Sequence, residues 1–335
     1  MCAFARSSIA QTIDDQPYIE EVRIFDPDFT LPHAAGIAFS PFANIFLLLT
    51  DHSTYQPGGE SKNLTMISPF EDLIGSINLP SIANPINMTF DSNANRLLLF
   101  DTDRQELIEI KANPDGNVDP AAINRYEAHQ FNVQNPQGMT LDPVDGSLFI
   151  LSETNSRIVV IKPDAQGSFN GATALAEDRI TQINLIQFGL GPLRGLALNP
   201  INGHLYVLNP VLLNLYEVSK TGQLVATREM SILDVGFRDP QGIVFAPSAD
   251  LTDDPAQMHL FLMDSGLGPL STESSDQRDN LSASQSMSPC SDTARPAKKG
   301  PGRIIEFTLT QSIENPLPQG QTFFYSHLPT RLTMK

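Results

Sequence analysis

The chain has 335 residues, of which 41% are hydrophobic, and its 38 acidic and 21 basic side chains give a formal net charge of −17. This length suffices for a large buried core, whereas two cysteines, Cys2 and Cys290, exclude a disulfide framework or a thiolate metal cage. The acidic surplus repels phosphate backbones, so we expect no nucleic-acid partner. No apolar run approaches the roughly 20 residues of a membrane-crossing helix, so we expect no membrane insertion.

Short apolar runs, punctuated by 26 Pro and 21 Gly residues, follow one another along the chain, which is typical of β-strands joined by turns. The first run, Tyr18–Phe25, stands alone. Five similar segments then follow at intervals of about 50 residues, and they start at Gly36, Asn87, Gly138, Gly195 and Gly242. One supersecondary unit is therefore repeated five times.

Each unit contains four apolar runs, and we expect each run to form a strand. The first two are joined by turn sequences such as DPVDG at Asp142–Gly146, which predict a hairpin. The second run, for example LLLF or LYVL, is continuously apolar, which indicates burial on both faces. The third runs begin at Leu64, Leu107, Ile158, Leu215 and Ile304. The fourth runs are Leu73–Leu79, Ile123–Phe131, Ile180–Phe188, Leu224–Leu233 and Phe323–Leu328.

Repeated four-stranded antiparallel units with doubly covered central strands predict an all-β fold, a β-propeller. We expect one propeller domain over residues 17–328, with units that start near residues 36, 87, 138, 195 and 242. Tyr18–Phe25 resembles a fourth strand that has no partners upstream. We therefore interpret five recognisable blades plus this extra N-terminal strand as an incomplete six-bladed ring, and a five-bladed ring with an added strand is the alternative.

Two insertions interrupt the repeat. Residues 266–302, between the second and third runs of the last unit, are rich in Ser, Pro and charged residues, so we predict a disordered loop. We also predict a disordered N-terminus over residues 1–16 and a tail over residues 329–335. A shorter polar insertion follows Asp51 at the equivalent step of the first unit. Because strand direction alternates, both insertions and the starts of the first strands share one face, where we expect a ligand surface.

The repeated pattern Gly-(Ile/Met/Leu)-(Ala/Thr)-(Phe/Leu)-(Asp/Asn/Ser)-Pro, followed by Leu-(Tyr/Phe)-(Val/Ile), resembles NHL-repeat propellers and is similar to the related gluconolactonase and senescence-marker group. The resemblance covers roughly Tyr18 to Leu328 and is clearest in PQGMTLDPVDGSLFIL and LRGLALNPINGHLYVL. It implies the fold more specifically than a function, because propellers host both enzymes and binding domains.

The resemblance to lactonases of that group implies a divalent cation, usually Ca²⁺, held by carboxylates and amides at the channel mouth. The residues that precede the leading positions here are Ala35, Ile86, Gln137, Arg194 and Gln241. The family's Glu is missing, and Arg194 places a cation where the metal would sit, which argues against a lactonase mechanism. Asn87 matches an amide ligand of the family.

Acidic or amide side chains stand at or just after the ends of all five second strands, and they form a candidate metal site for Ca²⁺: Asp51, Asp101, Glu153, Asn209 and Asp264. The same rim would also suit a basic ligand. The alternative, which we favour, is that each side chain caps the backbone amides of the following turn and recurs because the blade recurs.

A second candidate site combines Gln137, Arg194 and Gln241 with Asn87 near the channel mouth. These side chains suit an anionic or sugar-like ligand bound by charge-assisted and amide hydrogen bonds. The alternative, favoured on the residues alone, is a polar lining of a water-filled channel.

These observations favour a non-catalytic propeller that binds a protein or a small molecule on the face that carries residues 266–302. The alternative is a calcium-dependent hydrolase of the lactonase type. HExxH, GxSxG and Walker-type phosphate motifs do not occur in the sequence. We expect an extracellular or periplasmic location if the sequence is a fragment that lacks its signal peptide, and the residues otherwise leave the compartment open.

Overall fold

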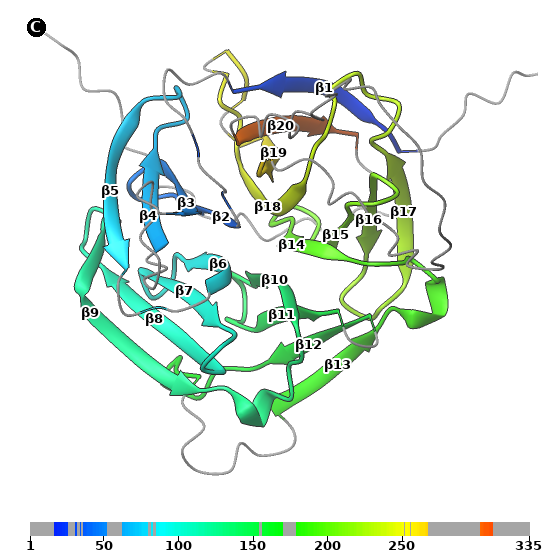
Figure 1. Cartoon of the computed structure of the whole chain (residues 1–335). Helices are drawn as coiled ribbons and strands as arrows, with labels where there is room; N and C mark the ends of the chain where they lie inside the picture. The colour runs from blue at the N-terminus through cyan, green and yellow to red at the C-terminus, as the bar shows by residue number, and fades with distance from the viewer. Residues whose placement is uncertain are drawn as a thin grey trace, which may run out of the picture.

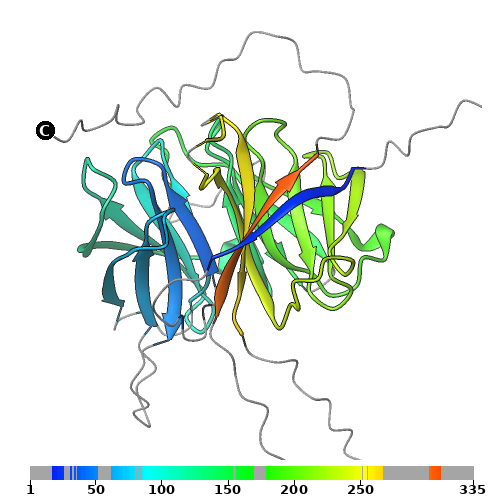
Figure 2. The same ribbon diagram turned by 90° about the horizontal axis from the view of Figure 1, so that it is seen from above.

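Five four-stranded antiparallel sheets surround a common axis in the computed structural model (Figure 1). The structure describes residues 17–25, 31, 34, 36–51, 62–79, 82, 85–153, 156–169, 179–250, 252–254, 256–266 and 302–310. Seen from the side, the sheets stand as the blades of a wheel (Figure 2). The fold is therefore the predicted all-β propeller, and its described strands make five blades.

Each blade consists of four strands that are numbered along the chain. Blade 1 contains β2 (Gly36–Ser40), β3 (Ile45–Asp51), β4 (Lys62–Ile67) and β5 (Leu73–Leu79). Blade 2 contains β6 (Pro85–Asp91), β7 (Arg96–Asp101), β8 (Glu106–Ala112) and β9 (Val118–Glu127). Blade 3 contains β10 (Pro136–Leu141), β11 (Leu148–Ser152), β12 (Arg157–Ile161) and β13 (Ile180–Asn184). Blade 4 contains β14 (Arg194–Leu198), β15 (Leu205–Asn209), β16 (Asn214–Val218) and β17 (Leu224–Glu229). Blade 5 contains β18 (Pro240–Pro247), β19 (Met258–Asp264), β20 (Arg303–Leu309) and β1 (Ile19–Ile24).

Side chains of the second and third strands fill the spaces between blades. The described buried apolar residues form five clusters, and each cluster joins two neighbouring blades. Leu97 and Leu98 on β7 are both fully buried, but Leu97 belongs to the cluster with blade 1 and Leu98 to the cluster with blade 3. Burial of both faces explains why the second strands are continuously apolar, and each such side chain contributes roughly 1.5–3 kcal/mol.

The leading glycines of the first strands allow the blades to meet closely at the axis. A Cβ atom at Gly138 would lie 2.6 Å from the backbone nitrogen of Leu196 in the next blade. At Gly195 the backbone has a φ of +66°, and a Cβ atom would lie 3.0 Å from the carbonyl oxygen of Gln241. Only glycine satisfies both the space and the dihedral angle there.

Strand β1 completes blade 5 and closes the ring. It pairs antiparallel with β20, with Val22 opposite Phe307 and Ile24 opposite Ile305. At the ends of this pair, the amide N–H of Tyr18 donates to Thr310 Oγ1 at 2.8 Å, and the N–H of Thr310 donates to the carbonyl oxygen of Tyr18 at 3.1 Å.

The expectation of an incomplete six-bladed ring is therefore wrong. Strand β1 does have a partner strand. That strand is β20, which lies near the other end of the chain and not upstream of β1. Phe25 lies in one cluster with Ile37 of blade 1 and Phe261 of blade 5, so the first and last blades are in contact. The expected fourth run Phe323–Leu328 lies outside the described residues, as do residues 1–16, 267–301 and 329–335.

Three of the predicted fourth strands end earlier than their apolar runs, and one of them is β17, which stops at Glu229. β9 stops at Glu127 and β13 at Asn184, and each is followed by a single 3₁₀ turn, His129–Phe131 and Ile186–Phe188 respectively. Left-handed residues, Asn132 at φ 50° and Gly189 at φ 60°, end these turns.

Among the described residues, no helix has the length and apolar content that crossing a membrane would take.

Candidate functional site

The two ends of the central channel differ in chemistry. The first strand of each blade starts on the face where the second strand ends, as the pairing of Pro240 with Asp264 and of Pro85 with Asp101 shows. We call this side the mouth face and the opposite side the far face. Gly266 and Gly302, which flank residues 267–301, belong to the mouth face because they adjoin the end of β19 and the start of β20.

Irregular pairing at the strand starts shapes the mouth. In blades 2 to 5 the register between first and second strand shifts at the first or second residue, next to Asn87, Gln137, Gly195 and Gln241. Such bulges turn a side chain away from the regular alternation of the sheet. The residues inside these shifts are Ile86, Gln137, Gly195 and Gln241, so two of the four are glutamines.

A chain of hydrogen bonds crosses the mouth through four blades. Asn87 Nδ2 donates to the carbonyl oxygen of Gln137 at 3.2 Å, and Arg194 Nε donates to Gln137 Oε1 at 3.3 Å. Arg194 Nη1 reaches Asp239 Oδ1 at 3.2 Å, and Ser265 Oγ donates to Asp239 Oδ2 at 2.8 Å. Three of the four side chains predicted for ligand binding thus form one network, which the structure extends to Asp239 and Ser265.

Arg194 lies at the centre of this network and is only partly buried. Its side chain is 35% exposed and that of Asp239 is 25% exposed. Nη2 of Arg194 donates no hydrogen bond to another described residue, so the partly exposed guanidinium keeps donors to spare. The sequence carried a signal for Asp239 that was missed, because Asn84 and Asn135 stand at the same position, directly before the proline that begins the repeat.

Gln241 and Glu153 lie at the margins of this arrangement. Gln241 is half-buried, and its side chain makes no hydrogen bond with another described residue. Glu153 is exposed and accepts a hydrogen bond from Asn135, which in turn accepts one from Gln137 Nε2 at 3.1 Å. Glu153, predicted as a metal ligand, therefore extends the network of the other predicted site.

The buried members of the acidic rim contact backbone amides of nearby turns. Asp101 Oδ1 accepts the N–H groups of Asp103 at 3.2 Å and Arg104 at 3.4 Å. Asn209 Oδ1 accepts those of Val211 at 2.9 Å and Leu212 at 2.8 Å. These are the contacts of turn caps, which is the interpretation that the repeat favoured.

Asp264 has the same role with different partners. It accepts the N–H groups of Arg238 at 3.1 Å and Asp239 at 2.7 Å, and Arg303 Nη2 lies 3.1 Å from its Oδ2. The side chain of Asp51 lies outside the described residues. Where side chains are described, no three His, Cys, Asp or Glu residues gather as ligands for one metal ion.

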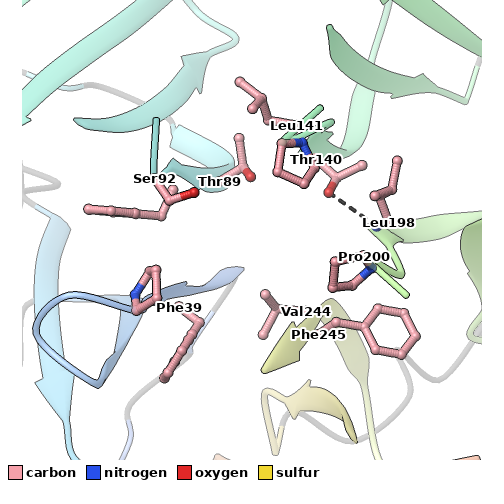
Figure 3. Close-up of a pocket in the computed structure, with 12 residues that line it drawn as sticks. Phe39, Thr89, Ser92, Thr140, Leu141, Leu198, Pro200, Val244 and Phe245 are labelled. Atoms are coloured by element: carbon pink, nitrogen blue, oxygen red, sulfur yellow. Dashed lines mark hydrogen bonds between the residues drawn. The ribbon is translucent and has the colours of Figure 1, made fainter. Parts of the chain in front are cut away.

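The far end of the channel is a small pocket that opens to solvent and has no charged side chain in its lining. It has a volume of about 80 Å³ and lies among the ends of the first strands (Figure 3). Equivalent apolar residues from all five blades line it, and they are Phe39, Phe90, Leu141, Leu198 and Phe245. The sequence carried a signal, because Phe or Leu recurs at this position of every repeat.

Comparison with known proteins gives structural likeness and no match by sequence. No protein-family model and no curated protein sequence matches the chain. A luciferin-regenerating enzyme is 12% identical with a TM-score of 0.47, over 87% of this chain and 95% of its own. A nidogen/laminin complex is 13% identical with a TM-score of 0.43, over 70% and 76%. A streptogramin B lyase is 13% identical with a TM-score of 0.38, over 72% and 80%. At these values none of them assigns an activity or a partner to this chain.

Proposed function

We propose that this protein is a non-catalytic binding module whose mouth face takes a small anionic or sugar-like ligand, or such a group on a protein. The observation that carries the proposal is the position of Arg194, whose guanidinium is fixed by Asp239 and Gln137 and still presents donors at the channel opening. A fixed guanidinium recognises carboxylates and hydroxyl groups without a large loss of conformational freedom.

The surroundings of Arg194 support recognition of a polar group. Gln137 and Gln241 bring half-buried amide groups to the starts of two blades, and amides both donate and accept hydrogen bonds. Asn87 is buried, and its amide holds the backbone of Gln137. Asp239 balances the charge of Arg194 when no ligand is present, so the site does not hold an uncompensated charge. A ligand would then be selected by hydrogen-bond geometry more than by net charge.

A thermal-shift screen of carboxylates, monosaccharides and oligosaccharides against the full chain tests the proposal. At 100 times its dissociation constant a ligand stabilises the folded state by about 2.7 kcal/mol, which raises the melting temperature by several degrees. We expect Arg194→Gln to weaken binding of a hit by about tenfold or more. Arg125→Gln, which also breaks an ion pair but on the outer strand β9, is the matched control and leaves binding unchanged.

The same screen, extended by two measurements, distinguishes the proposed binding module from a calcium-dependent hydrolase. Titration with CaCl₂ and lactone hydrolysis with and without EDTA are the additional measurements. Stabilisation by Ca²⁺ together with EDTA-sensitive hydrolysis would replace the binding proposal by the enzyme. Equal affinity of the wild type and Arg194→Gln for every ligand found would remove Arg194 from the site and leave the proposal without its central residue.

A further inference from the structure

We propose that the cavity at the far end of the channel is a second ligand site, for a small uncharged ring that bears a hydroxyl group, such as a phenol. The proposal does not depend on the function of the mouth, because the two sites lie at opposite ends of the first strands. Its basis is the lining, the volume and the hydroxyl groups of this cavity.

The lining selects against charge. All twelve residues around the cavity are Phe, Leu, Val, Pro, Thr or Ser, although 18% of the chain is charged. Transfer of a charged group into such surroundings is costly unless a partner charge is present. The mouth, by contrast, contains Arg194 and Asp239, so the two ends of the channel suit different classes of ligand.

The volume fits one ring. The cavity measures about 80 Å³ on a scale on which one water requires roughly 10–15 Å³, so it has room for about five to eight water-sized groups. A phenyl or cyclohexyl ring with one substituent has that size. Phe39, Phe90 and Phe245 line the pocket from three blades, while their rings also pack in the clusters between blades. Figure 3 shows Phe39 and Phe245 on different sides of an open centre.

Two threonine hydroxyls give the site a polar point of attachment. Thr140 Oγ1 accepts the N–H of Leu198 at 3.2 Å, which leaves its own proton free to donate toward a ligand. Thr89 is half-buried in the lining and makes no hydrogen bond with another described residue. A hydroxyl group on the guest can accept from one threonine and donate to the other, which an unsubstituted ring cannot do.

The rim extends the apolar surface beyond the cavity. Pro143 and Pro200 stand at equivalent places in the rim, and the residue that follows each of them is an exposed aliphatic side chain. Val144 is 59% exposed and Ile201 is 42% exposed. A substituent on the outer side of the ring would therefore rest on apolar side chains of two blades.

Titration of the full chain with phenol, toluene and benzoate, followed by calorimetry and by methyl NMR, tests this inference. We expect saturable binding of phenol below about 10 mM, within the range for a ligand of this size. Toluene should bind more weakly because it has no group that can form a hydrogen bond with the threonine hydroxyls. Benzoate should bind at least about tenfold more weakly because no side chain of the lining can pair with its charge.

Three variants locate the site. Thr89→Val should weaken phenol binding by about threefold to tenfold and leave toluene unchanged, whereas Thr181→Val on the exposed face of β13 should change neither. Val244→Phe should fill the cavity and abolish binding of both, with far-UV circular dichroism as the check that the fold persists. Benzoate that binds as tightly as phenol, or phenol that binds undiminished to a folded Val244→Phe, would overturn the inference.

Discussion

Three glutamates occupy the same position in the third strands of blades 2, 4 and 5, and all three are buried. Glu109 accepts from Arg96 Nη1 at 2.7 Å, Glu217 from Arg228 Nη1 at 2.8 Å, and Glu306 lies 2.8 Å from His259 Nδ1. The repeat therefore preserves a buried carboxylate. Blades 4 and 5 share a histidine partner, since His204 Nδ1 also lies 2.7 Å from Glu217, whereas blade 2 uses Arg96. Loss of one partner would leave a buried charge without compensation, which is far more costly than loss of an exposed ion pair.

Hydrogen bonding decides the pKa of Glu109. Burial alone would raise it, but hydrogen bonds from Asn124 and Arg96, with the charge of Arg96, outweigh burial and hold the pKa below its ordinary value of 4.5. A carboxyl whose pKa is lowered by folding stabilises the protein above the unfolded value, and that contribution is lost as the pH falls through the folded one. Protonation of Glu109 therefore contributes to the loss of folding stability that we expect at low pH.

Tyr206 has the opposite effect, because it lowers the folding stability as the pH rises. Burial, followed by the nearby charge of Glu217, raises its pKa from 10.0 to about 12. The unfolded chain therefore releases this proton first, and the folded state loses up to about 3 kcal/mol between pH 10 and pH 12. We expect Tyr206→Phe to reduce the alkaline decline, measured by urea unfolding at pH 8 and at pH 11. An equally steep decline in the variant would contradict this assignment.

At the scale of the element, β1 is held mainly by the aromatic residue that follows it. The ring of Phe25 is 2% exposed and meets Phe46 edge-on at 6.1 Å and Phe261 at 5.8 Å, so it joins blades 1 and 5. We expect Phe25→Ala to lower the free energy of unfolding by about 3–5 kcal/mol. Ile24→Ala, at a neighbouring position that is 42% exposed, should cost less than about 1 kcal/mol. Similar losses for both variants would show that the aromatic contact is not the main attachment.

Elements with local signals could be predicted from the sequence, and those that depend on distant partners could not. The hairpin turns, the doubly buried second strands and the leading glycines follow from neighbouring residues alone. The place of β1 depends on pairing with β20 across almost the whole chain, so its pattern was recognised while its position was not. In the same way the repeat marked Asn87, Gln137 and Arg194, whereas the contact between Arg194 and Asp239 became visible only with blades 4 and 5 side by side.

At the scale of the whole molecule, the ring is closed by the chain itself, because β1 completes blade 5 and directly precedes β2 of blade 1 in the sequence. A chain that starts at residue 26 would lack β1 and Phe25 and would expose the edge of β20. We expect this truncated chain to melt at a much lower temperature and to associate through that edge, as measured by scanning calorimetry and light scattering. A synthetic peptide of residues 17–25 should restore the monomer. A truncated chain that stays monomeric and melts like the intact protein would show that β1 does not close the ring.

The hydrogen bonds between Tyr18 and Thr310 also place the first and the last described segments of the chain side by side. A short linker from residue 310 to residue 17, with new termini opened between β17 and β18, would turn the last blade into one continuous stretch of polypeptide. Every blade would then consist of four consecutive strands. Blades 4 and 5, on either side of the new termini, would be joined by side-chain packing alone. Unfolding of this circular permutant would show how much cooperativity depends on a blade built from both ends of the chain, and how much on the packing between blades.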